Sequence, residues 1–447
     1  MVERATESLD VVVIGGNVRG LVTCYLLDRF GYRAVLLERG QSIGGVDRSF
    51  VTSDGTTFDH GMHVLDEMRS PLATRLFMQV VDGEVHRVRL RRGIVIRNHV
   101  MTYAPRPSEM PDELRRMLPS DNLVDDLGDE LPTRDRLARY YGTEFADLIF
   151  DEVLPSYPSE NRHREFGVDP SRLLANIYPW FFPRSTRTPH SGDESRAFHD
   201  RLRSGIDQHI LYPKRGGFGG FVDGFLRKLD PDRIEVLTGV DDLHVELSPG
   251  THTALWIDAA GRRFTAPHVF WAGAWALLCG VLGIPCQETA TDRVLLGSFR
   301  LDRPAITDYH ELLFGDPDYR MNRVFFPSFF RRSDEALMQV EYSFPKADPR
   351  EIDAETWKEI WLADARRCGL IDDDHRVELF DFKTFCMHFN GYGMEGQALV
   401  DADPSLVRQD SNIHPVVPSM ANLNLNRYVP RTVELVASVL ARSGTAR

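Results

Sequence analysis

The stretch from Asp10 to Arg48 decides the fold, and it reads DVVVIGGNVRGLVTCYLLDRFGYRAVLLERGQSIGGVDR. Residues 11–14 are apolar and mostly β-branched, which predicts a strand buried on both faces of a parallel sheet. Residues 21–30 repeat apolar side chains at helical spacing, and Gly31 stands where a helix commonly ends. Residues 34–37 predict a second buried strand that ends at Glu38. The order strand, helix, strand predicts a βαβ unit.

Three glycines, Gly15, Gly16 and Gly20, lie between the first strand and the helix. In the pattern G-x-G-x-x-G the first glycine permits a tight turn, and the amides at the helix start face a diphosphate. An acid at the end of the second strand, here Glu38, accepts the ribose hydroxyls. Asn17 replaces the middle glycine. Asn tolerates positive φ better than most residues, so we expect the turn to form, although its side chain crowds the position nearest the diphosphate. The alternative is a βαβ unit whose glycines only close a turn.

Further motifs follow the fingerprint. Glu38-Arg39 precedes Gly44-Gly45 and Arg48, and residues 57–64 read TFDHGMHV. Here the sequence resembles the FAD-binding flavoprotein superfamily that contains amine oxidases, phytoene desaturases, protoporphyrinogen oxidase and UDP-galactopyranose mutase. The resemblance implies that the cofactor is FAD and not free NAD. A second glycine pair lets backbone pass close to the cofactor, and Arg48 can add a charge-assisted contact to phosphate.

Two later stretches extend the resemblance. Residues 212–220, YPKRGGFGG, look like the Y-P-x-G-G segment of the superfamily, and residues 234–240 resemble the strand whose final valine, Val240, contacts adenine. Near the C-terminus Ser419-Met420 stands where the superfamily has Gly-Arg or Gly-Asp, so the usual arginine contact to the diphosphate is absent. Pro430 suits the first turn of a helix over residues 431–440 whose N-terminus points at the flavin. The predicted cofactor-binding residues are Gly15, Gly16, Asn17, Gly20, Glu38, Arg39, Gly44, Gly45, Arg48, Gly61, Met62, Val240, Met420, Tyr428 and Val429.

The predicted fold class is α/β: a Rossmann-like FAD-binding domain of the glutathione-reductase-like type with an inserted mixed α+β substrate domain. At 447 residues the chain is too long for one simple core, which favours two domains. The FAD-binding domain is predicted to comprise residues 1–100, 205–275 and 385–447. A helical part of the substrate domain is expected over residues 101–204 and a strand-rich part over residues 276–384.

Three functions remain open. The first is chemistry at the flavin N5 atom, either isomerase-like or redox. Its substrate would be a sugar nucleotide or another small anionic metabolite of a biosynthetic pathway. Residues 316–328 look like a stretch found in bacterial flavoproteins of such pathways. His63 is the candidate residue at the flavin face; the alternative is a histidine that only packs in the structure. Arg323 is the candidate for ligand binding; the alternative is an arginine paired with a carboxylate. The second is an FAD-dependent oxidase or dehydrogenase of an amine or a carbon substrate. The third is a non-catalytic relative that has lost FAD.

Composition excludes several classes. The net charge of −13 argues against nucleic acid as a partner, because no basic excess is available for phosphates. The five cysteines contain no C-x-x-C pair, so we expect neither a disulfide framework nor a metal site. Residues 1–9 lack signal-peptide features, and no apolar run is long enough to span a membrane. We therefore expect a cytoplasmic protein that acts on a small molecule, with its oligomeric state open.

Overall fold

The computed structural model describes residues 5–67, 70–102, 109–117, 134–135, 138, 142–153, 209–284, 290–345, 348, 352–389, 407–408, 410–416 and 425–442. The chain divides into two compact units. Unit 1 comprises Met1–His86, Leu211–Glu288 and Val400–Arg447, and unit 2 comprises Arg87–Ile210 and Thr289–Leu399. The chain passes between the units within β7 (Val85–Arg89) and β10 (His209–Pro213).

The centre of unit 1 is a five-stranded parallel sheet in the order β11-β3-β2-β15-β21. Both strands predicted in the fingerprint are confirmed at the predicted bounds and are buried along their whole length. This burial on both faces explains why their sequences are continuous apolar runs. The strands are β2 (Val11–Ile14), β3 (Ala34–Leu37), β11 (Ile234–Leu237), β15 (His268–Trp271) and β21 (Ile413–Pro415).

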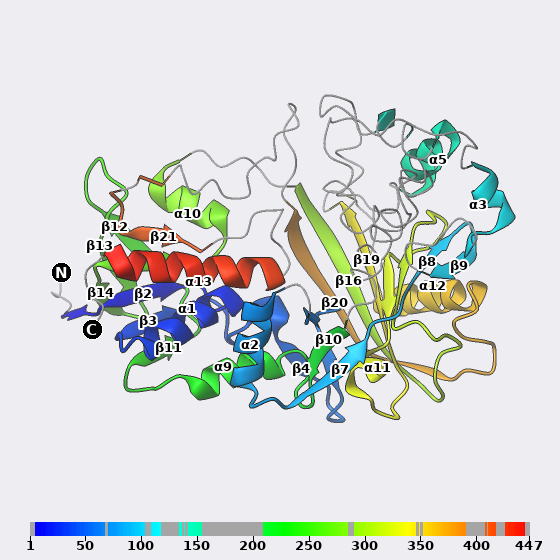
Figure 1. The fold of residues 1–447 in the computed structure, drawn as a ribbon, viewed down its shortest axis with the longest axis horizontal. Helices are drawn as coiled ribbons and strands as arrows, with labels where there is room; N and C mark the ends of the chain where they lie inside the picture. The colour runs from blue at the N-terminus through cyan, green and yellow to red at the C-terminus, as the bar shows by residue number, and fades with distance from the viewer. Residues whose placement is uncertain are drawn as a thin grey trace, which may run out of the picture. The chain divides into compact units, whose positions relative to one another are not determined.

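Two layers cover this sheet. Helix α1 (Val18–Arg29) packs on one face, and Figure 1 shows α13 (Leu425–Arg442) lying alongside it. On the other face Val12, Val35 and Trp271 share an apolar cluster with Ile257 and Phe264 of a smaller sheet. That sheet has the order β1-β14-β13-β12 and consists of β1 (Thr6–Ser8), β12 (His244–Leu247), β13 (Ala254–Ala259) and β14 (Arg262–Thr265).

Two further helices of unit 1 pack against each other. Helices α2 (Pro71–Val80) and α9 (Gly220–Lys228) meet through aromatic rings, with Phe77 edge-on to Phe221 at 4.9 Å and to Phe225 at 5.3 Å. Such pairs add to the burial energy of the rings. The other elements are the 3₁₀ turn η1 (Gly45–Asp47), β4 (Ser49–Val51), β5 (Thr57–Asp59), β6 (Leu65–Asp66) and α10 (Trp275–Leu282).

The structure corrects the expected C-terminal helix. Helix α13 begins at Leu425, so Pro430 lies in its second turn and not at its start. Pro430 has no N–H to donate to the carbonyl of residue 426, so the helix lacks one intrahelical bond at this turn. The fingerprint helix likewise begins earlier than predicted, at Val18, because Asn17 caps it.

Unit 2 is built on a seven-stranded sheet in the order β20-β16-β19-β18-β17-β8-β9, in which only β17 and β8 run parallel. One face packs its core against α12 (Ala354–Arg367), where Trp357 and Trp361 meet Phe299, Tyr342 and Phe344. The strands are β8 (Arg92–Ile96), β9 (His99–Thr102), β16 (Ala290–Leu301), β17 (Glu311–Phe314), β18 (Arg323–Phe325), β19 (Leu337–Pro345) and β20 (Val377–Phe389). The other elements are α3 (Asp112–Met117), α5 (Thr143–Asp147), the π-helical turn η3 (Leu148–Val153) and α11 (Pro327–Arg331).

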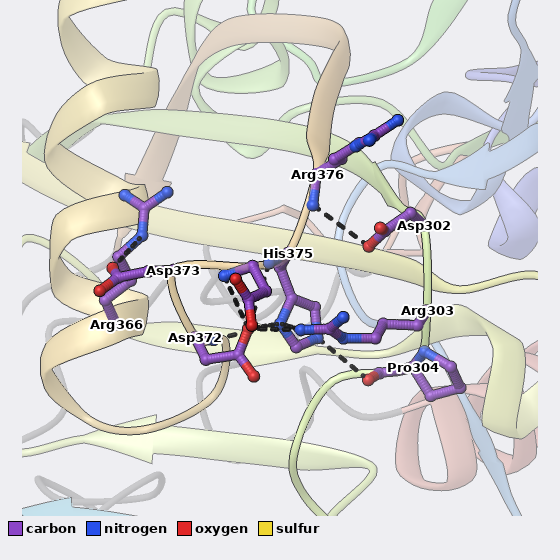
Figure 2. A network of polar contacts seen from close by, with 9 residues as sticks. Asp302, Arg303, Pro304, Arg366, Asp372, Asp373, His375 and Arg376 are labelled. Atoms are coloured by element: carbon purple, nitrogen blue, oxygen red, sulfur yellow. Dashed lines mark hydrogen bonds and ion pairs between the residues drawn. The ribbon is translucent and has the colours of Figure 1, made fainter.

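A polar network fastens the turn between α12 and β20 to the loop after β16 (Figure 2). His375 Nδ1 lies 2.7 Å from Asp372 Oδ1, and His375 Nε2 lies 3.3 Å from the carbonyl oxygen of Pro304. Asp302 accepts a hydrogen bond from the Arg376 amide at 3.1 Å. These contacts fix the end of the helix that supports the core of unit 2.

The predicted α/β class and Rossmann-like domain are confirmed. The unit bounds differ from the predicted domain bounds in four places, one of which is residues 205–210, which belong to unit 2. Residues 87–100 belong to unit 2 because β8 and β9 join its sheet, and β20 carries that unit beyond residue 384. Residues 276–288 belong to unit 1, where α10 packs. Most of the helical part expected over residues 101–204 lies outside the described residues. No helix in the described part of the chain is long and apolar enough to cross a membrane.

Candidate functional site

The glycine turn after β2 brings α1 unusually close to the sheet. Gly15 has a φ of +105°, and a Cβ there would lie 2.6 Å from the Gly273 nitrogen. A Cβ on Gly20 would lie 1.9 Å from the carbonyl oxygen of Gly15. Only glycine fits these two positions, so the N-terminus of α1 is placed directly over the ends of β2 and β15.

Glu38, at the end of β3, faces the same turn. Its carboxylate accepts hydrogen bonds from the amides of Gly16 and Gly40, each at 2.6 Å. A carboxylate has about four acceptor positions, so the half-buried Glu38 can accept further donors such as hydroxyls. Val240 is buried and donates its amide to the Glu38 carbonyl at 3.0 Å, which brings the predicted adenine contact to this end of the sheet.

Asn17 does not adopt the positive φ that its place in the motif suggested. It is the N-cap of α1 with φ −74° and ψ 179°, an extended conformation open to any residue. Its Oδ1 accepts hydrogen bonds from the amides of Arg19 at 3.0 Å and Gly20 at 3.4 Å. Its Nδ2 donates to the carbonyl of Ala272 at 2.6 Å. The side chain therefore lies on the helix N-terminus itself.

Arg19, which sequence reasoning missed, lies beside Asn17. Its Nη2 donates to the same Ala272 carbonyl at 2.9 Å. Its Nε is buried and has no hydrogen-bond partner among the described residues. Burial lowers the pKa of the Arg19 guanidinium, while the neighbouring Tyr428 and Asp47 raise it. The guanidinium carbon lies 5.8 Å from the centre of the Tyr428 ring.

The second glycine pair follows. Gly44 and Gly45 have φ values of +112° and +56°, and Gly44 pairs with Asn17 in an isolated parallel bridge. Among the residues that the structure describes, a Cβ on Gly45 would meet nothing closer than the Cβ of Asn17 at 3.9 Å. Arg48 donates to the Ile43 carbonyl at 3.1 Å, and Arg39 is exposed.

The predicted flavin-face residue, His63, has a partner that was not predicted. Its Nδ1 lies 3.5 Å from Oδ1 of the buried Asp47, and its Nε2 lies 3.2 Å from the His60 carbonyl. Burial raises the pKa of the Asp47 carboxyl, while His63 and Arg19 lower it. The His63 ring also packs against Phe218, with 5.6 Å between ring centres.

The other predicted residues are placed as follows. Gly61 has a φ of +104°, and Met62 is half-buried. Val429 is fully buried in α13, and burial raises the pKa of the Tyr428 hydroxyl well above its usual value. Met420 lies outside the described residues.

Arg323 lies in unit 2, within a row of alternating charges across four strands. Its Nη2 lies 2.6 Å from Glu341 and its Nη1 lies 3.5 Å from Glu311. Glu311 in turn pairs with Arg92 at 2.5 Å, and its side chain is only 2% exposed.

We call Arg92, Glu311, Arg323 and Glu341 the charge row. It lies on the face of the sheet opposite α12, because the alternate residues Leu312, Val324 and Val340 belong to the core on the helix side.

The comparisons agree with this architecture. Residues 13–80 match the family described as NAD(P)-binding Rossmann-like domain. All-trans-retinol 13,14-reductase of Rattus norvegicus is 34% identical over 85 residues, which are 19% of this chain and only 14% of that protein. A solved structure of reduced UDP-galactopyranose mutase has a TM-score of 0.67 at 15% identity and covers 97% of this chain and 94% of its own. Putrescine oxidase bound to putrescine has a TM-score of 0.63 at 13% identity, covering 98% of this chain and all of its own.

By fold, the chain is similar to FAD-binding, amine-oxidase-like flavoproteins. The predicted fold is thus confirmed, and the predicted family agrees with these matches. FAD as the cofactor and a flavin-dependent enzyme as the class agree with the same matches.

The residues of unit 1 fit the cofactor of this superfamily. Glu38 has acceptor capacity left for ribose hydroxyls, the space beside Gly45 is open among the described residues, and Arg19 holds a buried N–H without a partner in the described chain. Arg19 had a detectable signal in the sequence: it is a cation in the first turn of a helix, where the dipole favours anions. Asp47 had no such signal in the sequence, because its pairing with His63 depends on how two loops fold together.

Proposed function

We propose that this chain is an FAD-dependent enzyme acting on a small molecule, with the cofactor held at the glycine turn of unit 1. The observation that carries the proposal is the convergence of Glu38, the N-terminus of α1 and the glycine pair on one end of the parallel sheet. In α/β sheets of this kind ligands bind at the carboxyl ends of the strands. When bound, FAD would supply an N5 atom able to accept hydride or, once reduced, to act as a nucleophile.

Different residues of the chain would contact different parts of the cofactor. Glu38 would accept the ribose hydroxyls, and the amides at the start of α1 would face the diphosphate. The remaining predicted contacts, Arg39, Arg48, Gly61, Met62, Met420, Tyr428 and Val429, are part of this proposal. His63 would lie at the flavin face, where Asp47 holds its Nδ1 side and so orients the ring.

The first candidate reaction is rearrangement or oxidation of a sugar nucleotide or another small anion in a biosynthetic pathway. It is supported by the fold shared with UDP-galactopyranose mutase and by Arg323, a half-buried cation on a sheet face of unit 2. This candidate requires Arg323 to exchange a carboxylate partner for the substrate.

A second candidate is favoured by the balance of the charge row. Its two arginines already face two glutamates, so an anionic substrate would gain little net attraction there. Redox chemistry on an amine or a carbon substrate needs orientation more than charge. Putrescine oxidase shares the fold, and the retinol reductase is similar over 85 residues.

The absorbance spectrum of the purified protein tests the proposal, with the cofactor released by heat and identified. We expect flavin bands and FAD, and a weaker or absent flavin complement in Glu38→Ala. A colourless wild type that also fails to take up added FAD would refute the enzyme and favour a non-catalytic relative.

Turnover then separates the two candidates. Conversion of a UDP-sugar only after reduction by dithionite supports the first. Reoxidation of substrate-reduced flavin by oxygen, with an amine or an unsaturated carbon substrate, supports the second. Arg323→Gln should abolish the first activity, whereas His63→Gln should impair either.

A further inference from the structure

Arg19 is a cation in an unfavourable place. It lies in the first turn of α1, where the helix dipole and free amides carry partial positive charge. Its guanidinium is buried against the Ala272 carbonyl, and its Nε lacks a partner among the described residues. A buried N–H without an acceptor is costly, and more so when it is charged. An anion at this point would satisfy the dipole and the guanidinium together.

We propose that Arg19 binds the diphosphate of the dinucleotide, and that the Asn17 side chain occupies the same position in the ligand-free chain. The proposal rests on the proposed FAD-dependent function and adds to it two residues with opposite roles. Arg19 attracts the ligand, and Asn17 competes with it.

The hydrogen bonds of Asn17 explain the competition. Its Oδ1 already accepts from two first-turn amides, those of Arg19 and Gly20, which are the donors that a diphosphate oxygen needs. Binding would therefore exchange an uncharged amide oxygen for a charged phosphate oxygen on the same donors. Such a charge-assisted bond is roughly twice as strong as a neutral one, so the exchange favours the ligand.

Room and charge near the turn suit this exchange. Among the described residues, only the Asn17 Cβ at 3.9 Å lies near the position of a Cβ on Gly45, so within this part of the chain a rotated Asn17 side chain or a phosphate has space there. Both Asn17 and Arg19 donate to Ala272, which places the guanidinium beside the capped amides. Asp47 raises the pKa of the Arg19 guanidinium through its charge, and it balances part of that charge in the absence of ligand.

Calorimetric titration with three probes tests the proposal: FAD, ADP and adenosine. Arg19→Met keeps the length and apolar packing of the side chain but removes charge and donors. We expect it to weaken the binding of FAD and ADP at least tenfold and to leave adenosine binding unchanged. Arg19→Lys should lie between, because it keeps the charge without the fork of donors. Asn17→Gly should tighten FAD and ADP several-fold, and Asn17→Asp should weaken both.

Arg29→Met is the matched control, since it removes the same charge from the exposed far end of the same helix. It should bind all three probes as the wild type does, and circular dichroism should show each variant folded. The assignment would be overturned if Arg19→Met and the wild type bound ADP with equal affinity. It would also be overturned if Arg19→Met lost affinity for ADP and adenosine in parallel, or if the wild type did not bind ADP. If the wild type binds ADP through Arg19 but never FAD, the assignment stands and the proposed FAD-dependent function fails.

Discussion

The two units differ in how their buried charged side chains are paired. In unit 2 every member of the charge row has an opposite charge on the neighbouring strand, and Glu311 lies between two arginines. In unit 1 the guanidinium of Arg19 donates to a carbonyl, its Nε has no hydrogen-bond partner among the described residues, and the amides beside it are held by the uncharged side chain of Asn17. A self-satisfied row is what a stable sheet needs, whereas incompletely satisfied polar groups at a helix N-terminus suit a ligand.

The largest effect is expected where the backbone of unit 1 is tightest. Gly20→Ala places a Cβ 1.9 Å from the Gly15 carbonyl oxygen, so α1 must move away from β2. We expect a loss of about 4 kcal/mol in unfolding free energy and the loss of FAD binding. Chemical denaturation followed by circular dichroism measures the first and calorimetry the second.

Gly280→Ala is the control for that substitution. Gly280 lies within α10 with nothing near its Cβ position, so alanine should stabilise the helix by about 0.5–1 kcal/mol. If Gly20→Ala behaves like Gly280→Ala, α1 does not depend on close contact with the glycine turn.

The next effect tests the charge row. Glu311→Gln removes the buried carboxylate that pairs with Arg92 and Arg323 and leaves Glu341 as the one acid of the charge row, so we expect about 3 kcal/mol of destabilisation. FAD affinity should not change, because the cofactor site is assigned to unit 1. Asp308→Asn is the control: its side chain is 90% exposed and its pair with Arg91 spans 3.6 Å, so its loss should be scarcely measurable. A Glu311→Gln protein as stable as this control would mean that the row does not hold the sheet together.

Lowering the pH should reveal a further difference in stability, between the wild type and a variant at His310. Burial and the nearby Arg91 lower the pKa of His310, which lies in unit 2 beside β17, to about 4 from a usual value of 6.5. The folded state therefore favours the neutral ring, and its contribution is complete above pH 6.5 and is lost as the pH falls towards 4. Between pH 7 and 5 the wild type should lose about 2 kcal/mol more stability than His310→Gln, measured by urea unfolding at both pH values.

His244→Gln provides the comparison for the acid experiment. His244 is exposed on β12, so its replacement removes a histidine ring without disturbing the core. Parallel pH profiles for His310→Gln and the wild type would show that His310 protonates as easily in the folded chain as in the unfolded one.

The sequence was sufficient where chemistry is local. Residues 11–14 and 34–37 could be recognised because strands buried on both faces require unbroken apolar runs, and Glu38 follows directly from its place after the second. The superfamily followed from short motifs around the cofactor. None of these inferences needed a contact between distant residues.

What the sequence could not show depends on long-range contacts. Arg19 reaches Ala272, 253 residues away, and only this contact reveals that its Nε is left without a partner in the described chain. Asn17 was expected to adopt a left-handed turn, but a hydrogen bond from its amide to Ala272 and two bonds to its oxygen made it a helix cap instead. Arg323 was predicted as a ligand residue, and its carboxylate partners come from other strands. Its role in binding stays a prediction.

The smallest effect compares two helix caps of the same kind. In unit 2 Asp353 caps α12, accepting from the amide and the hydroxyl of Thr356 at 2.8 and 2.7 Å. Asp353→Ala should cost about 1 kcal/mol in unfolding free energy and leave FAD affinity unchanged. Asn17→Ala should cost a similar amount, yet it should raise FAD affinity, because the cap it removes competes with the diphosphate. Denaturation and calorimetry on the two variants give both quantities. If both substitutions destabilise the chain and neither alters FAD affinity, the cap of α1 is as purely structural as that of α12, and the difference between the units lies in Arg19 alone.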